Sequence, residues 1–297
     1  MSINTILAPL SGGTSDPVTI QTAFQVAASF SAHVEVLFAR IPPTEAVPLV
    51  GEGVTAGMIE QLMQTAENES LDREAAAREC YDAARRALDV DERDVPTPDG
   101  RASASWRCDD GRERDVVAVA SRLADLVVLS HEGRAFDDAR LSATLEAALM
   151  GGGKPLLLAP PEPIGEPTGE PMGAIGRSVC IAWNGSLQAA RAVAGARPFL
   201  KRADSVSILT VATSRTDVSV GHRLRQYLAW HGIDAINRPL NAENRSVGET
   251  ILEATTSDGA DLLVMGGYTH GRLREMVFGG VTRHVLNHAG IPVLMAH

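Results

Sequence analysis

The residues best suited to chemistry lie together near the end of the chain, in the stretch 261–286. An apolar run, residues 262–265, stops at the pair Gly266-Gly267, and a second pair, Gly279-Gly280, opens a helical pattern. Glycine lets a backbone approach a phosphate closely, and guanidinium groups bind phosphate oxygens well. The stretch supplies three guanidinium groups, on Arg272, Arg274 and Arg283. Together these residues indicate a site for an anion, and a nucleotide phosphate is the leading interpretation.

A strand must carry the first glycine pair to such a site. A short apolar run bounded by turn residues, within an alternating β/α pattern, predicts a buried parallel strand. In open α/β sheets ligands bind at the carboxyl ends of the strands, where the free N–H groups of helix N-termini also lie. The alternative interpretation is that the glycines form ordinary strand-to-helix turns and the arginines a solvated face. The spacing alone leaves both open.

The chain contains an internal duplication. Residues 6–11 form an apolar run ending in a polar residue, and residues 179–184 have the same shape 173 positions later (184 − 11). Each half continues with helices and strands in the same order. The paired predictions are helices at 15–31 and 188–200, strands at 33–39 and 205–212, strands at 125–129 and 261–265, and final strands at 155–159 and 292–296. Strands that alternate with helices predict a doubly wound parallel sheet in each half.

The predicted domains are residues 1–160 and residues 177–297, joined by a linker rich in proline and glycine at 161–176. The first half is longer, and its extra residues lie mainly between positions 40 and 98. Within them, residues 58–88 have the composition of one long helix with an exposed face. The last strand of each half is an edge that must be covered. We therefore expect residues 155–159 to pair with 292–296 across a pseudo-twofold axis, which makes the two halves an intramolecular pseudo-dimer.

The charge of the chain is uneven. The net charge is −10, whereas a nucleic-acid surface needs a basic patch, so we expect no nucleic-acid partner. Residues 1–160 carry 14 Lys+Arg and 25 Asp+Glu, and residues 161–297 carry 13 and 12, so the halves bear −11 and +1. The half with the glycine pairs repels an anion less. No apolar run is long enough to span a bilayer, and the three scattered cysteines suit a reducing compartment, so we expect no membrane association and a cytoplasmic location.

A family resemblance is carried by Gly266-Gly267-Tyr268-Thr269-His270, followed by Arg272-Leu273-Arg274-Glu275 and Phe278-Gly279-Gly280-Val281-Thr282. This segment resembles the C-terminal signature of the universal stress protein family. ATP-binding members have a glycine, two residues, a glycine, nine residues, and a glycine followed by serine or threonine. Those positions fall here on Gly266, Thr269, Gly279 and Gly280, so the second and the last depart from the pattern. Gly271 and Thr282 are available to replace what is missing.

The resemblance implies two tandem Rossmann-like domains of the adenine nucleotide alpha hydrolase type, each with a five-stranded parallel sheet flanked by helices. It implies a role in stress response and ATP or another adenine nucleotide bound in the second half, without enzymatic activity beyond at most a weak ATPase. In the family the first strand ends in an aspartate that contacts the nucleotide, and Ser11 and Asn184 occupy those positions here. The nucleotide-binding residues expected from the match are Asn184, Val211, Gly266, Thr269, His270, Gly271, Arg272, Gly279, Gly280, Val281 and Thr282.

The first half lacks this chemistry, because Asp137 and Asp138 stand where the second half has arginines. We therefore expect no nucleotide there. His284 and His288 lie four residues apart on a predicted helix, but no third ligand accompanies them, so we expect no metal. The alternative to a nucleotide-binding protein is a nucleotide-independent interaction or scaffold protein of the same fold, with an unknown protein partner. Association of two chains as a homodimer also stays open.

Overall fold

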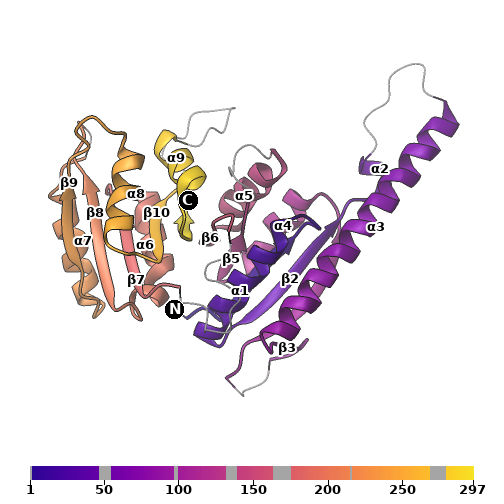
Figure 1. The fold of residues 1–297 in the computed structure, drawn as a ribbon, viewed down its shortest axis with the longest axis horizontal. Coiled ribbons are helices and arrows are strands. Elements are labelled where there is room, and N and C mark those ends of the chain that lie inside the picture. Colours follow the sequence, from indigo (N-terminus) through magenta and orange to yellow (C-terminus); the bar gives the residue numbers. More distant parts are fainter. Residues whose placement is uncertain are drawn as a thin grey trace.

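The computed structural model describes most of the chain. The described residues are 2–46, 55–96, 100–131, 139–162, 175–214, 216–267 and 279–297. Strands and helices alternate through both halves (Figure 1). The first half contains β1 (Thr5–Leu10), α1 (Asp16–Phe30), β2 (His33–Arg40), α2 (Pro43–Ala46), α3 (Ala56–Ala87), β3 (Asp91–Glu92), β4 (Ser103–Asp110), α4 (Glu113–Ala120), a 3₁₀ turn (Ser121–Leu123), β5 (Leu126–Leu129), α5 (Ala139–Gly152) and β6 (Leu156–Leu158).

The second half repeats this order in a shorter form. It contains β7 (Ser178–Ala182), α6 (Leu187–Leu200), β8 (Ser205–Val211), α7 (Val220–Trp230), β9 (Ile236–Leu240), α8 (Val247–Ser257), β10 (Leu262–Gly266), α9 (Gly280–His288) and β11 (Val293–Ala296). Most of its strands are buried along their length, as expected of a sheet covered by helices on both faces. The predicted α/β class is confirmed.

All the strands join one sheet, in the order β3-β4-β2-β1-β5-β6-β11-β10-β7-β8-β9. Every neighbouring pair is parallel except β6 and β11, which run antiparallel with Leu157 opposite Leu294. This is the pairing of the two final strands that the sequence predicts. The two five-stranded sheets are therefore fused, and β3 adds a two-residue strand at the outer edge of the first half.

Each face of the sheet carries a core that runs through both halves. Side chains of α1, α3, α6 and α7 form one core, and those of α4, α5, α8 and α9 form the other. The halves also meet through aromatic side chains, because the rings of Phe30 and Phe199 pack edge to face with centroids 5.0 Å apart. The guanidinium of Arg202 lies 5.1 Å from the ring centre of Phe30. The two halves consequently share their apolar interior.

The long helix predicted at residues 58–88 is α3, and it has 32 residues. It connects β2 to β4, the place that the 11-residue helix α7 takes between β8 and β9. The extra length of the first half is thus mainly an extended crossover helix. Only Ala77 and Tyr81 of α3 are buried, and its N-terminal part projects from the body of the molecule (Figure 1). Within the residues that the structure describes, no helix combines the length and the apolar composition needed to cross a membrane.

Candidate ligand cavity in the second half

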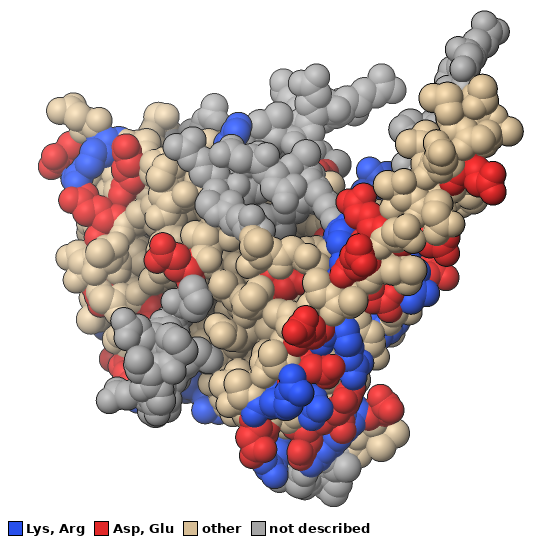
Figure 2. Space-filling view, turned by 45° about the vertical axis from the view of Figure 1, so that its right-hand side comes forward, with Lys and Arg blue, Asp and Glu red and all other residues tan. Residues whose placement is uncertain are grey.

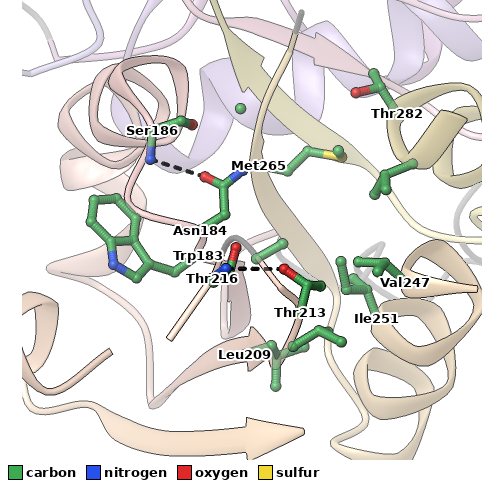
Figure 3. A pocket seen from close by; sticks show the side chains of 14 residues that line it. Trp183, Asn184, Ser186, Leu209, Thr213, Thr216, Val247, Ile251, Met265 and Thr282 are labelled. Atoms are coloured by element: carbon green, nitrogen blue, oxygen red, sulfur yellow. Dashed lines mark hydrogen bonds between the residues drawn. The ribbon is translucent and has the colours of Figure 1, made fainter. Parts of the chain in front are cut away.

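A cavity of about 370 Å³ lies at the carboxyl ends of β7, β8 and β10. Its volume falls within the range of small-molecule sites in proteins. Helices α8 and α9 close it on one face of the sheet (Figure 3). The cavity therefore occupies the place where an open α/β sheet binds its ligands.

The inner wall of the cavity is apolar. Strands contribute Leu209, Val211 and Met265, and helix α8 contributes Val247 and Ile251. The strand residues belong to the core beneath α8 and α9, so their side chains are fixed by packing. Such a wall favours the flat, apolar face of a ring system.

Three oxygen atoms at the polar rim of the cavity already accept hydrogen bonds from backbone N–H groups. Oδ1 of Asn184 accepts a hydrogen bond from the Ser186 N–H at 3.0 Å, and Oγ of Ser186 accepts one from the Ala189 N–H at 3.2 Å. Oγ1 of Thr213 accepts from the Thr216 N–H at 3.0 Å. The first bond leaves the Asn184 amide nitrogen directed toward Met265 (Figure 3). The rim therefore offers a ligand chiefly hydrogen-bond donors.

Trp183 joins the cavity to helix α7. Its indole Nε1–H donates to the carbonyl oxygen of Val220 at 3.1 Å, at the first residue of that helix. The ring is half-buried and forms part of the cavity wall. A large aromatic residue held by both packing and a hydrogen bond is a rigid wall.

Gly266 has a packing role in addition to its place in the lining. A β-carbon added there would lie 2.6 Å from the backbone nitrogen of Ala189 and 2.9 Å from the carbonyl carbon of Gln188. The first turn of α6 thus rests directly on the end of β10. Glycine at this position brings a helix close to the strand, whereas the sequence suggested close approach of a phosphate.

Helix α9 begins at the mouth of the cavity. Gly279 is its N-cap and makes no side-chain capping bond, and Val281 and Thr282 of its first turn line the cavity. The first N–H groups of a helix have no acceptor within the helix, and the helix dipole places partial positive charge there. This end of the cavity is therefore suited to an anionic group.

The structure gathers five of the predicted site residues around this one cavity: Asn184, Val211, Gly266, Val281 and Thr282. Gly279 and Gly280 lie at the start of α9, next to the lining residues. The remaining predictions, Thr269, His270, Gly271 and Arg272, lie outside the described residues. The binding roles of all eleven stay predictions.

Sequence reasoning missed nine of the 14 lining residues (14 − 5). Trp183 and Met265 directly precede residues that were predicted, and Ser186 is the N-cap of α6, so all three carried a local signal. No local signal in the sequence marks Val247 and Ile251. They lie on α8, far from the predicted residues in sequence, and only the folded chain brings them to the cavity.

No acidic or basic side chain lines the cavity among the residues that the structure describes. Positive charge for a phosphate must therefore come from the first turn of α9 or from the arginines of the glycine motif. Over the described ranges, no group of three or more metal-ligating side chains is found. His284 and His288 stack on each other with ring centroids 4.4 Å apart.

The turn that follows the first strand of the first half is held by other contacts. The Asp16 carboxylate accepts hydrogen bonds from the N–H groups of Ser11 at 3.0 Å and Gly12 at 2.8 Å. Burial raises the pKa of Asp16, and these bonds partly oppose the shift. Helix α3 covers the same loop, because Arg73 donates to the Ser11 carbonyl oxygen and its backbone packs against Gly12. The long helix thus lies over the turn that follows the first strand.

Comparisons with known proteins agree with this geometry. Residues 222–297 match the model of the universal stress protein family. The chain is similar in structure to a universal stress protein from Archaeoglobus fulgidus DSM 4304, with 16% identity, a TM-score of 0.65, and 99% of this chain and 96% of that chain covered. It is also similar to a functionally unknown protein, PA1789 from Pseudomonas aeruginosa PAO1, with 11% identity, a TM-score of 0.50 and coverage of 98% and 92%. A search of curated proteins finds no match.

Fold and cavity together define a tandem α/β protein in which two doubly wound halves share one sheet. The likeness over nearly the whole length of the Archaeoglobus fulgidus protein concerns this fold. The match to the universal stress protein family lies within the second half, at residues 222–297, and confirms the resemblance predicted from the glycine motif.

Proposed function

We propose that this universal stress protein binds an adenine nucleotide in the cavity of its second half and holds it without converting it. The observation that supports this most is the position of the cavity. It lies at the carboxyl ends of β7, β8 and β10, beside the first turn of α9, and both parts of the predicted site contribute to its lining.

The proposed pose follows from the chemistry of the wall. The adenine ring packs between Val211, Ile251 and Met265, where the lining is apolar. The ribose faces Asn184, whose amide N–H groups donate to its oxygens. The phosphates extend to the first turn of α9, where the N–H groups have no acceptor within the helix and the helix dipole favours negative charge.

The lining supports binding and offers little for catalysis. No carboxylate, histidine, cysteine or lysine belongs to it within the described residues. General acid–base catalysis needs such a group within hydrogen-bond reach of the reacting atom, and the serine and threonine hydroxyls of the lining need an adjacent base to act as nucleophiles. We therefore expect no release of phosphate from ATP above the rate in buffer, measured with a coupled phosphate assay.

Calorimetric titration with ATP, AMP and adenosine tests the proposal. The wild-type chain is expected to bind at least one of them with one site per chain, and Val247→Trp is expected to abolish binding because the indole fills the cavity. Val119→Trp is the matched control, since Val119 is exposed on α4 in the other half and is expected to leave binding unchanged. Thermal unfolding establishes that both variants are folded.

Two results would contradict the proposal. The first is the absence of heat and of retained nucleotide at millimolar concentrations for all three ligands. The second is undiminished binding by a folded Val247→Trp variant, which would place the ligand elsewhere. Native mass spectrometry of the freshly purified protein supplies an independent measurement, with one adenine nucleotide per chain as the expected result.

A further inference from the structure

The outer face of α7 carries an unusual line of side chains. Arg223, Tyr227 and Trp230 follow one another at a spacing of four and three residues, so they lie along one side of the helix. Trp230 is 90% exposed and Tyr227 is 43% exposed. Residues 220–231 contain no acidic residue, and no acidic partner is recorded for Arg223 among the described residues. Large aromatic residues exposed beside an unpaired arginine are typical of an interface.

The projecting part of α3 carries a complementary line. Met58, Leu62, Glu69 and Asp72 share one side of the helix, and Met58 and Leu62 are 52% and 47% exposed. Residues 56–72 include four acidic residues and no basic one. In the described part of the chain none of these four acids takes part in an ion pair. In Figure 2 the outer end of this helix, at upper right, is tan and red.

A hollow accompanies the acidic end of this line. It has a volume of about 620 Å³ and lies where α3 passes over Gly12. Thr65, Glu69 and Asp72 form its wall on the helix side. The body of the molecule thus leaves room beside α3 for the end of another element.

The two lines match in spacing. Leu62 and Glu69 are seven residues apart, as are Trp230 and Arg223, and seven residues of α-helix span about 10 Å. With the helices antiparallel, Trp230 meets Leu62 while Arg223 meets Glu69.

We propose that two copies of this chain associate through these faces, with α3 of each copy packed antiparallel against α7 of the other. The two helices lie at opposite ends of the molecule (Figure 1), on the same face of the sheet. Two chains lying side by side in opposite directions form the contact twice, and the assembly is closed by twofold symmetry. The interface joins the acidic first half of one copy to the nearly neutral second half of the other.

The charge distribution favours a second copy as the occupant. The first half carries −11 and the second +1, so α3 belongs to a strongly acidic part of the chain and α7 to a nearly neutral part. The two helices are also complementary in chemistry. Among the described residues, α3 has unpaired acids beside aliphatic side chains, and α7 has an unpaired arginine beside aromatic rings. Complementary charge at a partly apolar contact fixes register and steers association.

Sedimentation velocity on the full chain tests this proposal. Wild-type protein is expected to shift from monomer toward dimer over about 1 to 100 µM, and Arg223→Glu and Glu69→Arg are each expected to weaken association about tenfold or more, because the pair occurs twice. Mixing the two variants in equal amounts is expected to restore a dimer, since both contacts are attractive in that combination. Arg225→Glu, with the same charge change on a flank of α7 outside the Arg223–Trp230 line, is the matched control and is expected to associate like the wild type.

Three outcomes would overturn the proposal. They are a wild-type chain that stays monomeric across the range, association that survives both charge reversals, and a mixture that remains monomeric. Far-UV circular dichroism of each variant shows whether it is folded. Trp230→Ala supplies a further measurement without charge reversal, and it is expected to weaken association while leaving nucleotide binding unchanged.

Discussion

Asn184 occupies the position at which the universal stress protein family has an aspartate. Its neighbours determine which atom of its side chain faces the cavity. The Ser186 N–H needs an acceptor and takes Oδ1, so the amide nitrogen is the atom left for the cavity. An aspartate here would make the same bond with one oxygen and present the other as a charged acceptor. The exchange of one atom therefore changes a donor into an anionic acceptor.

Asn184→Asp is expected to raise the affinity for adenosine about fivefold, because a hydrogen bond to a charged group contributes about 1 kcal/mol more than a neutral one. Calorimetric titration measures the change. Adenine without the ribose serves as the control ligand and is expected to bind equally to both proteins. Asn184→Ala is expected to weaken adenosine binding, since the Ser186 N–H loses its partner as well. Equal affinity of wild type and Asn184→Asp for adenosine would show that the ribose does not face this residue.

His33 offers a prediction at the same scale, about stability. Its ring nitrogens lie 2.9 Å from the hydroxyls of Ser103 and Ser105, and burial lowers its pKa, with Glu35 and Asp94 opposing the shift. The folded protein therefore holds the proton less tightly than the unfolded chain, whose histidine titrates near about 6.5. Above that pH His33 is neutral in both states and does not change the free energy of unfolding. As the pH falls from there through the folded pKa, the unfolded chain binds the proton first, and the folded protein loses stability.

The measurement is urea unfolding at pH 7.5 and at pH 5.5, for wild type and His33→Gln. The wild type is expected to lose more free energy of unfolding between the two pH values than the variant, which has no proton to bind at this position. Equal losses would mean that His33 has the same pKa in the folded and unfolded states.

At the scale of elements, two of the motif glycines, Gly266 and Gly280, behave differently. A β-carbon at Gly266 would meet the backbone of α6, whereas one at Gly280 would meet no atom of the described residues within 4 Å. Gly266→Ala is expected to destabilise the protein by about 1–3 kcal/mol, because a helix backbone cannot yield as a flexible side chain can. Gly280→Ala is expected to be neutral or to stabilise by up to about 1 kcal/mol, since alanine favours a helix.

Thermal unfolding of the two variants checks this pair of predictions. A Gly266→Ala protein with unchanged midpoint would contradict the close packing of α6 on β10. The same experiment followed by adenosine titration is informative, because a shifted α6 also moves Ser186 and with it Asn184. We expect Gly266→Ala to weaken binding and Gly280→Ala to retain it.

Elements whose sequences are strongly patterned were predictable. β5 and β10 are uninterrupted apolar runs because both of their faces are buried, and α3 has a composition rich in helix formers. The outer strands β4 and β9 gave no such signal, since their residues are only partly buried. α2 and β3 are too short for any period to appear.

The site was predictable to the extent that it follows strand ends. Asn184, Val211 and Gly266 each sit at or just beyond the end of a strand, and parallel strands bring such ends together. Val247 and Ile251 were beyond reach, because their place in the wall depends on how α8 crosses the sheet. The hydrogen bond from Arg73 to the Ser11 carbonyl oxygen was equally hidden, since it joins a turn to a helix 62 positions away.

For the whole molecule, the junction of β6 and β11 makes the halves one cooperative unit. Leu157 and Leu294 face each other there and are fully buried, and both cores run across the junction. Leu157→Ala is expected to cost about 2–5 kcal/mol and to lower the unfolding midpoint of both halves together.

Tryptophan fluorescence separates the two halves in this experiment, because Trp106 reports on the first and Trp183 on the second. Variants that retain Trp106 or Trp183 as their only tryptophan, with Trp230 also replaced, are expected to show coincident thermal transitions, with and without Leu157→Ala. The exposed substitution Val119→Ala is the control and is expected to leave the midpoint unchanged. A shift confined to the Trp106 signal would mean that the halves unfold independently.

The two outermost strands of the fused sheet, β3 and β9, affect how readily the protein aggregates through its sheet edges at high concentration. β3 consists of two acidic residues tied to arginines, and β9 contains an exposed proline, Pro239, which has no N–H for a further strand. Edge strands that are short, charged or interrupted by proline are poor templates for cross-β growth. Because the fusion at β6 and β11 removes two further edges, we expect β3 and β9 to give the described sheet little tendency to add strands at its ends.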